Sequence, residues 1–231
     1  MLQAQSLTKK YGEHTALDAL NLTINKGEIF CLLGQNGAGK TTTVNLFLGF
    51  IKPTSGTASI NGIEVAPNAM ATKKHIAYIP EVVMLYGNLS GVENLHFFSR
   101  LAGFKYSDDL LSGFLSSAGL QKEAHAKRVN TYSKGMRQKV GIAIALAKNA
   151  DAILMDEPTS GLDPKATAEF TDICKRLATE GRAIFMATHD IFGAVNVASQ
   201  IGIMKQGSLV HTVDTADITA AGLQSLYLET I

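Results

Sequence analysis

The clearest chemical signature of the chain is a loop of glycine, lysine and threonine. Residues 34–41 read Gly-Gln-Asn-Gly-Ala-Gly-Lys-Thr, which fits the phosphate-loop pattern G-x-x-x-x-G-K-[ST] without a mismatch. An apolar run at 28–33 predicts a buried strand before it, and residues 41–48 predict a helix after it. This strand, loop and helix order is the context that the motif requires. We therefore predict a nucleotide phosphate site, in preference to a glycine-rich turn that holds nothing.

Each position of this loop has a physical role. Glycines lack Cβ, so their backbone can take positive φ and bring N–H groups around an anion, and the following helix adds its positive end. Lys40 supplies a mobile charge for the β- and γ-phosphates, and Thr41 places a hydroxyl where Mg²⁺ would bridge them. The predicted nucleotide-binding residues of the loop are Gly34, Asn36, Gly37, Ala38, Gly39, Lys40, Thr41 and Thr42.

A second group of chemical residues follows an apolar strand at 152–157, which ends in the adjacent carboxylates Asp156 and Glu157. Strand alternation points neighbouring side chains in different directions, which permits two different roles. We assign Asp156 to Mg²⁺ and Glu157 to polarising the attacking water. A strand that ends in Asp-Glu usually means a solvated turn, but beside a phosphate loop it predicts nucleotide hydrolysis.

Two further residues are expected at this site. The buried strand predicted at 183–188 delivers His189 to its carboxyl end, where ligands bind in open parallel sheets. This position favours contact of His189 with the γ-phosphate over a structural role. Tyr11 stands just before a predicted hairpin turn, where its ring either packs or stacks on a nucleotide base.

Composition limits the class of protein. The 231 residues are 46% apolar, which suits a substantial core, and 21 basic against 20 acidic residues predict no nucleic-acid partner. Cys31 and Cys174 lack a C-x-x-C spacing, which predicts two reduced core thiols. Residues 1–10 are polar and mixed, which predicts no signal peptide. No apolar run approaches the roughly 18 residues that span a bilayer.

The elements around these residues predict a mixed α/β protein. Strands expected at 2–11, 20–24 and 57–60 form an antiparallel sheet beside the nucleotide strand, and the breakers at 52–56 are expected to end the first helix. Residues 75–80 predict a further strand. From about 91 to 150 the apolar spacing becomes helical and predicts an inserted helical lobe.

One more motif resembles a single family closely. Residues 132–139 read Tyr-Ser-Lys-Gly-Met-Arg-Gln-Lys, and in this order with the phosphate loop and Asp156-Glu157 they resemble the ATP-binding subunits of ABC transporters over nearly the whole chain. The resemblance implies a P-loop NTPase fold with a RecA-like parallel sheet, an antiparallel β subdomain and an inserted helical subdomain. The implied division is a nucleotide-binding core at 1–86 plus 151–231 and a helical subdomain at 87–150.

The resemblance also implies how the site is completed. The hydroxyl of Ser133, the N–H of Gly135 and a helix dipole form a second anion cradle. In the family two subunits pack head to tail, so this cradle is expected to meet the γ-phosphate held by Lys40 of the other copy or of a homologous subunit. We expect an ATP-sandwiched dimer, with Asp163 contacting across the interface and His189 sensing the γ-phosphate.

Two departures from the family pattern stand out. Lys134 and Met136 replace residues of the common Leu-Ser-Gly-Gly-Gln form, and Glu81 replaces the usual glutamine after a strand. As a carboxylate, Glu81 can accept from Mg²⁺-bound water, and we count it among the metal residues. Both variants, and the short chain, resemble the ABC-2-type exporter branch, which includes drug, sodium, lipid and haem-type exporter ATPases.

The leading function is therefore ATP hydrolysis that powers a separate transmembrane permease subunit. The chain is expected in the cytoplasm, peripheral on the inner face of the membrane, with residues 82–86 forming part of an apolar groove for a short permease helix. The alternative is a soluble ABC ATPase that serves an assembly such as an iron–sulfur scaffold. A nucleotide switch without turnover is disfavoured because Glu157 is present.

Overall fold

The computed structural model describes residues 1–231, and its centre is a six-stranded sheet. Five of its strands run parallel, and the edge strand β10 pairs antiparallel with β9. The strand order is β10 (Ser208–Asp214), β9 (Gln200–Lys205), β3 (Ile29–Gly34), β8 (Ala183–Thr188), β7 (Ala152–Asp156) and β6 (Ile76–Ile79). The carboxyl ends of β3, β7 and β8 meet at one edge, as expected for the site.

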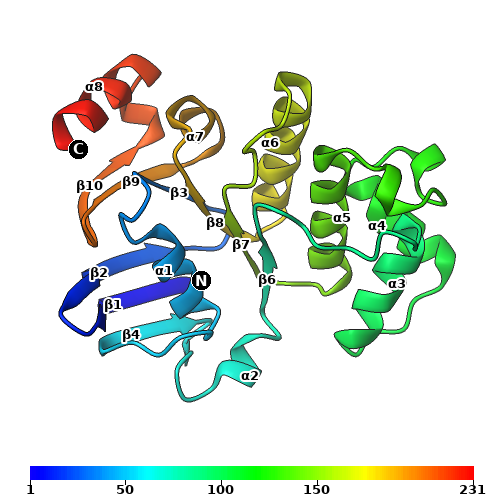
Figure 1. The fold of residues 1–231 in the computed structure, drawn as a ribbon, viewed down its shortest axis with the longest axis horizontal. Coiled ribbons are helices and arrows are strands. Elements are labelled where there is room, and N and C mark those ends of the chain that lie inside the picture. Colours follow the sequence, from blue (N-terminus) through cyan, green and yellow to red (C-terminus); the bar gives the residue numbers. More distant parts are fainter.

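A smaller antiparallel sheet lies beside the first one (Figure 1). Its order is β2 (His14–Ile24), β1 (Leu2–Tyr11), β4 (Ser55–Ile60) and β5 (Ile63–Glu64). The predicted sheet is confirmed, but β2 begins six positions earlier than predicted because a tight turn pairs Tyr11 directly with His14. Helix α1 (Lys40–Phe47) ends before residues 52–56, so these residues do not end the helix as predicted. They lead into β4, which starts at Ser55.

Alternation along β3 divides the interior into two cores. Phe30 and Leu32 face the core that contains α1 and the antiparallel sheet, whereas Ile29, Cys31 and Leu33 face the core that contains the helices that follow β6 in the chain. Because both faces of the strand are covered, it reads as a continuous apolar run. Helix α1 lies between the two sheets and so carries the phosphate loop on a rigid support.

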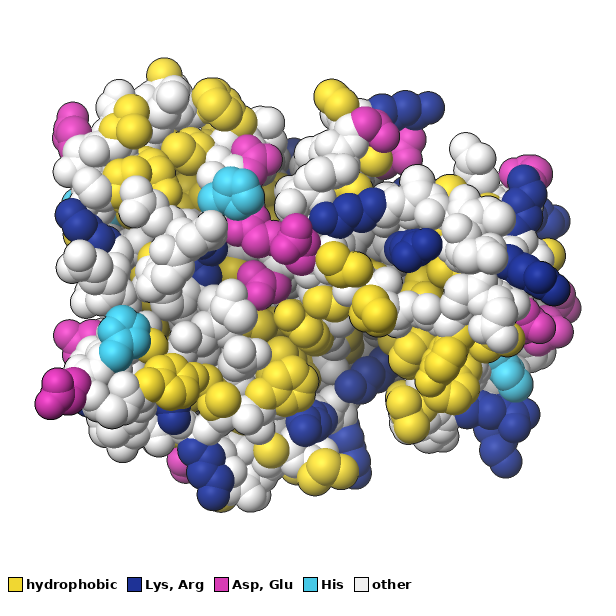
Figure 2. Space-filling model, viewed as in Figure 1, with side chains coloured by type: hydrophobic (Ala, Val, Ile, Leu, Met, Phe, Trp, Pro, Cys, Tyr) yellow, Lys and Arg dark blue, Asp and Glu magenta, His cyan; other side chains and the backbone are white.

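Three helices form the predicted helical region, which Figure 1 shows in green at the side of the molecule away from the small sheet. They are α3 (Gly91–Leu101), α4 (Asp108–Ser117) and α5 (Lys134–Ala147). Serine side chains cap all three, and Ser90 and Glu93 form a complete capping box on α3. Apolar side chains gather over the lower part of this region, and acidic side chains gather near the centre of the face (Figure 2).

Three of the remaining helices cover the large sheet: α6 (Pro164–Thr179), α7 (Ile191–Val197) and α8 (Ala220–Thr230). The short helix α2 (Ala69–Thr72) contacts β5 of the small sheet. The short helices α2 and α7 were not predicted, because four and seven residues are too few to set up an apolar period. Cys31 and Cys174 are buried and unbonded, as predicted, and burial raises the pKa of both thiols. None of the helices combines the length and hydropathy needed to cross a bilayer.

Candidate functional site

The phosphate loop connects β3 to α1, and the start of that helix carries no side-chain cap. Every helix of seven residues or more in the chain except α1 has a Ser, Thr or Asp side chain that accepts from its first turn. Gly39 stands at the cap position with φ 110°, and a Cβ there would lie 2.6 Å from the carbonyl oxygen of Ala16. The first N–H groups of α1 are therefore left open to an anion.

Lys40 is almost wholly buried, with 6% of its surface exposed. Its Nζ donates to the carbonyl oxygens of Gly34 at 2.6 Å and Gln35 at 3.2 Å, and lies 3.9 Å from Glu157 Oε1. Burial lowers the pKa of Lys40, and the nearby carboxylates of Glu157 and Asp156 oppose that shift. The ammonium is thus held against its own loop by groups that phosphate oxygens can replace.

Thr41 and Asp156 bring two oxygen atoms together beside Lys40. Thr41 Oγ1 donates to Asp156 Oδ2 at 3.1 Å. Burial raises the pKa of Asp156, the hydrogen bond from Thr41 lowers it, and the neighbouring charge of Glu157 raises it again. Hydroxyl and carboxylate oxygens are ligands that Mg²⁺ prefers, so the donor set fits that ion.

The backbone at Glu157 differs from the predicted strand. β7 ends at Asp156, and Glu157 already lies outside it with φ 46°, in the left-handed region. Its N–H donates to the carbonyl oxygen of Ala187 at 2.8 Å, so a sharp turn, and not strand alternation, separates the two carboxylates. A non-glycine residue in this conformation costs about 1–2 kcal/mol, and such strain clusters at functional sites.

The carboxylate of Glu157 is held by the end of β8. Its Oε2 accepts from Thr188 Oγ1 at 3.2 Å and lies 2.9 Å from His189 Nδ1. Its Oε1 faces Lys40. The His189 side chain remains 62% exposed, so it links the carboxylate to the open surface.

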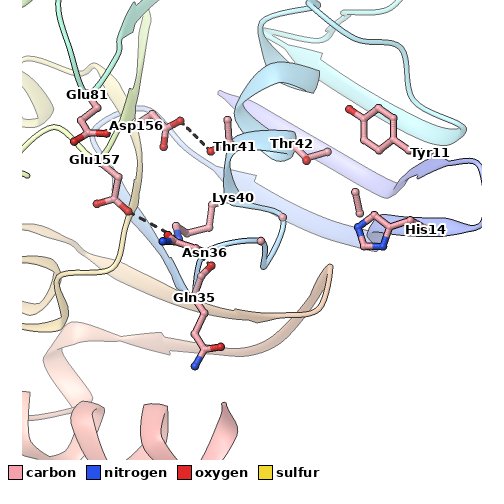
Figure 3. Close-up of a pocket in the computed structure, with 13 residues that line it drawn as sticks. Tyr11, His14, Gln35, Asn36, Lys40, Thr41, Thr42, Glu81, Asp156 and Glu157 are labelled. Atoms are coloured by element: carbon pink, nitrogen blue, oxygen red, sulfur yellow. Dashed lines mark hydrogen bonds and ion pairs between the residues drawn. The ribbon is translucent and has the colours of Figure 1, made fainter.

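These side chains line a pocket of about 450 Å³. Figure 3 shows the carboxylates at one end, Lys40 and Thr41 in the middle, and Tyr11 with His14 at the other end. The lining residues are Tyr11, His14, Ala16, Gln35, Asn36, Gly37, Gly39, Lys40, Thr41, Thr42, Glu81, Asp156 and Glu157. Gly34 and Ala38 also belong to the phosphate loop, but they are buried and do not line this pocket.

Sequence reasoning missed three of the lining residues: His14, Ala16 and Gln35. His14 and Ala16 lie on β2, where the pairing of Tyr11 with His14 brings His14 to the pocket, and Ala16 lies two residues further along the strand. The signal for them is the hairpin itself, because a residue paired with Tyr11 must share its surroundings. Gln35 lies within the predicted loop, where its carbonyl contacts Lys40.

Ser133, Gly135 and Asp163 do not reach this pocket. They line a separate hollow of about 190 Å³ between α5 and α6. Ser133 caps α5 by accepting from the N–H of Met136 at 3.2 Å, and Asp163 caps α6 by accepting from the N–H of Ala166 at 2.9 Å. The two predicted half-sites are therefore apart within one chain.

Comparisons with known proteins agree with this geometry. The family described as ABC transporter matches residues 17–160. The bacitracin transport ATP-binding protein BcrA of Enterococcus faecalis is 36% identical over 219 residues, which are 94% of this chain and 70% of that protein. The linearmycin resistance ATP-binding protein LnrL of Bacillus subtilis is 31% identical over 94% of this chain and 70% of its own length.

Solved structures give the same result. A structure of an ATP-binding subunit of an ABC transporter superposes with a TM-score of 0.86 at 28% identity, covering 99% of this chain and 98% of that one. The dimeric bacterial ABC transporter cassette MJ0796 gives 0.81 at 29% identity, covering 93% and 99%, and it has also been solved in a post-hydrolysis state with ADP and Pi. These likenesses confirm the predicted P-loop NTPase fold. The chain belongs to the ABC transporter family, as one of its ATP-binding and ATP-hydrolysing subunits.

Proposed function

We propose that the chain powers a separate membrane subunit that exports a drug-like or similar small molecule, and that it works as an ATP-sandwiched dimer. The dimer is inferred from the separation of the phosphate pocket and the hollow that contains Ser133. Since the pocket of one chain lacks this cradle, a second chain must supply it. Relatives named for bacitracin transport, linearmycin resistance and Nod factor export support the direction of transport. They give no support to the iron–sulfur scaffold alternative.

The proposed roles follow from the contacts. The open N–H groups of α1 and Lys40 bind the β- and γ-phosphates, and Tyr11 stacks on the base. Thr41 and Asp156 would hold Mg²⁺, and Glu81 would accept a hydrogen bond from a water bound to it. Bound Mg²⁺ supplies charge stabilisation to the transferring phosphoryl group. Glu157 accepts the proton of the attacking water, and His189 contacts the γ-phosphate and orients Glu157.

A groove on the helical region is the proposed seat of the membrane subunit. Val82, Met84 and Tyr86 are exposed, Met84 to 79%, whereas Val83 packs into the core and is excluded from the groove. Beside them α3 lines a hollow of about 590 Å³ with Phe97 and Leu101. We infer an amphipathic partner helix here, and hence a position at the cytoplasmic face of the membrane. Residues 87–150 then form the subdomain that receives the partner, and 1–86 with 151–231 the nucleotide-binding core.

The experiment that tests this function uses Glu157→Gln. The change keeps the shape of the side chain and both cradles but removes the acceptor for the water's proton, so hydrolysis falls by about 10²-fold or more. ATP then persists between two chains, and gel filtration with Mg-ATP shows a species of twice the monomer mass. A second change, Ser133→Arg, blocks the opposite cradle and returns the protein to monomer. Native hydrolysis by Glu157→Gln contradicts the catalytic role, and a monomer with bound ATP contradicts the shared site.

A further inference from the structure

Glu81 lies where three segments of the chain meet. It follows β6 and lines the phosphate pocket. Its Oε1 accepts from Ser160 Oγ at 3.0 Å and pairs with Lys134 Nζ at 3.5 Å. Ser160 belongs to the loop between β7 and α6, and Lys134 is the first residue of α5. One carboxylate therefore joins the nucleotide pocket to the helix that carries the second hollow.

Helix α5 holds this segment at two points. Besides the Lys134 pair, Gln138 Nε2 donates to the carbonyl oxygens of Glu81 at 3.1 Å and Pro80 at 3.3 Å. Lys134 and Gln138 are one helical turn apart and project from one face. Gln138 is buried, whereas Lys134 and Glu81 remain 32% and 51% exposed. The hydrogen bonds from the Gln138 amide fix the backbone of Pro80 and Glu81. The ion pair between Lys134 and Glu81 is the contact that a new charge in the pocket can change.

The charges around the pocket supply such a change. Glu81, Asp156 and Glu157 all line it, while Lys134 lies outside and attracts Glu81 from the other side. A divalent cation bound with ATP beside Thr41 and Asp156 would compete with Lys134 for the Glu81 carboxylate. An exposed ion pair biases an equilibrium by only about two- to fivefold, so a divalent cation can displace it.

We propose that Lys134 is a positioning residue that couples the chain's own pocket to its own Ser133 cradle. In the structure Lys134 is paired with Glu81 and does not line the hollow that contains Ser133 and Gly135. When Mg-ATP draws Glu81 away, Lys134 is released beside Ser133, where its charge favours the γ-phosphate of the other chain. Each chain thus presents its full cradle only when its own nucleotide is in place. This inference rests on the proposed function.

Hydrogen exchange of the backbone amides of Met136 and Arg137, which donate to the hydroxyl and carbonyl oxygens of Ser133, tests the coupling in the full chain. The protein is kept at a concentration where sedimentation shows a monomer, so that no second chain protects the cradle. Saturating Mg-ATP should speed exchange at these amides by about two- to fivefold, the scale of the lost ion pair. ATP with a chelator should leave the rate unchanged, because no cation then draws Glu81 away.

Four variants separate this coupling from a structural role. Lys134→Met and Glu81→Gln should exchange fast without nucleotide and show no further response, and combining them should add nothing. Lys134→Arg keeps the positive charge and should show the same increase in amide exchange with Mg-ATP as the native chain. Lys165→Met is the matched control, because Lys165 lines the same hollow without pairing to Glu81, and it should respond as the native chain does.

The outcomes are distinct. A native chain that binds Mg-ATP, measured with a fluorescent nucleotide, but shows no faster exchange overturns the coupling and leaves the proposed function intact. A response that survives in Lys134→Met overturns it as well. A chain that binds no ATP overturns the proposed function and this inference together.

Discussion

The chemistry at the residue scale depends on how Glu157 leaves its strand. In the left-handed conformation its carboxylate lies between Lys40 and His189, while Asp156, one residue earlier, bonds to Thr41. Two adjacent carboxylates therefore serve different partners within one pocket. The buried ammonium of Lys40 is the common neighbour that both of them stabilise.

Lys40→Ala should weaken ATP binding by about 10- to 100-fold, because charge-assisted hydrogen bonds to the β- and γ-phosphates are lost. Titration with a fluorescent ATP analogue measures the change. Thr42→Ser serves as the control, since it keeps the backbone N–H and the hydroxyl. Native affinity in the Lys40 variant would contradict the assignment of the phosphate site.

Lys9 lies over the ring of Tyr11, the proposed base-stacking residue. Its Nζ lies 4.8 Å from the centre of the Tyr11 ring and also donates to the carbonyl oxygen of Lys52 at 2.9 Å. Lys9→Ala should weaken ATP and GTP binding alike, by about two- to fivefold, because an exposed cation–π contact is lost. The effect should vanish in a Tyr11→Ala background. Lys10→Ala is the matched control, and an equal loss there would point to general charge instead of ring support.

Site residues could be predicted from the sequence where the backbone conformation requires a particular residue type, as it requires glycine in the phosphate loop. The turn at Glu157 could not be predicted in this way, because a left-handed glutamate is imposed by its surroundings and not by its own preference. The pairing of Lys134 with Glu81 could not be predicted from the sequence either, since the two residues are far apart in the chain and meet only because α5 packs beside β6.

At the element scale, α5 has two functions at one end. Ser133 caps the helix because its side-chain oxygen accepts from the N–H of Met136. The same hydroxyl is the proposed hydrogen-bond donor to the γ-phosphate. The cap and the cradle therefore cannot be separated by Ser133→Ala, which removes both and costs the helix about 1 kcal/mol.

Ser133→Asp separates the two functions. Aspartate caps as well as serine does, so the free energy of unfolding should stay within about 0.5 kcal/mol of the native value. Its negative charge repels the γ-phosphate, so the dimer that Glu157→Gln forms with Mg-ATP should be lost. Urea unfolding and gel filtration give the two readouts. Ser107→Asp on α4 controls for the cap alone, and a stable dimer with Ser133→Asp would contradict the cradle.

Most of the strands and the longer helices were predictable because each carries a clear period or an apolar run. Strand β2 was predicted only at 20–24, because alternation weakens towards His14 and the missing part is fixed by pairing with β1. The short helices α2 and α7 depend on tertiary packing in the same way.

At the scale of the whole molecule, a polar cluster away from the phosphate pocket adds a link between the two sheets. Asn61, in the turn between β4 and β5, donates from Nδ2 to Asp151 Oδ2 at 2.9 Å, and His75 Nδ1 lies 2.7 Å from the same oxygen. Asp151 precedes β7 and His75 precedes β6, so the cluster ties the small sheet to the start of the large one.

This cluster should make stability depend on pH. Burial raises the pKa of Asp151, but hydrogen bonds and charge from His75, with Asn61, outweigh burial and lower it. A depressed folded pKa means stability that is present above the unfolded value of about 4 and is lost as pH falls through the folded value. Asp151→Asn should lower the free energy of unfolding by about 0.2–1 kcal/mol at pH 7, since the pair is partly exposed. Urea unfolding should show that difference shrink as the pH falls below about 4 and vanish once the pH is below the depressed folded pKa. A difference independent of pH would contradict the account.

The separation of the phosphate pocket from the Ser133 hollow has a consequence for inheritance. A chain with Lys40→Ala spoils only the pocket that it contributes, and a chain with Ser133→Asp spoils only its cradle. In a mixed pair one shared site carries both lesions and the other carries neither. Equal mixing of the two inactive proteins should therefore regain about a quarter of native ATPase activity, because half of the pairs are mixed and each has one sound site. No gain on mixing would contradict sites built from two chains. Two defective alleles of such a gene would then complement each other in one cell.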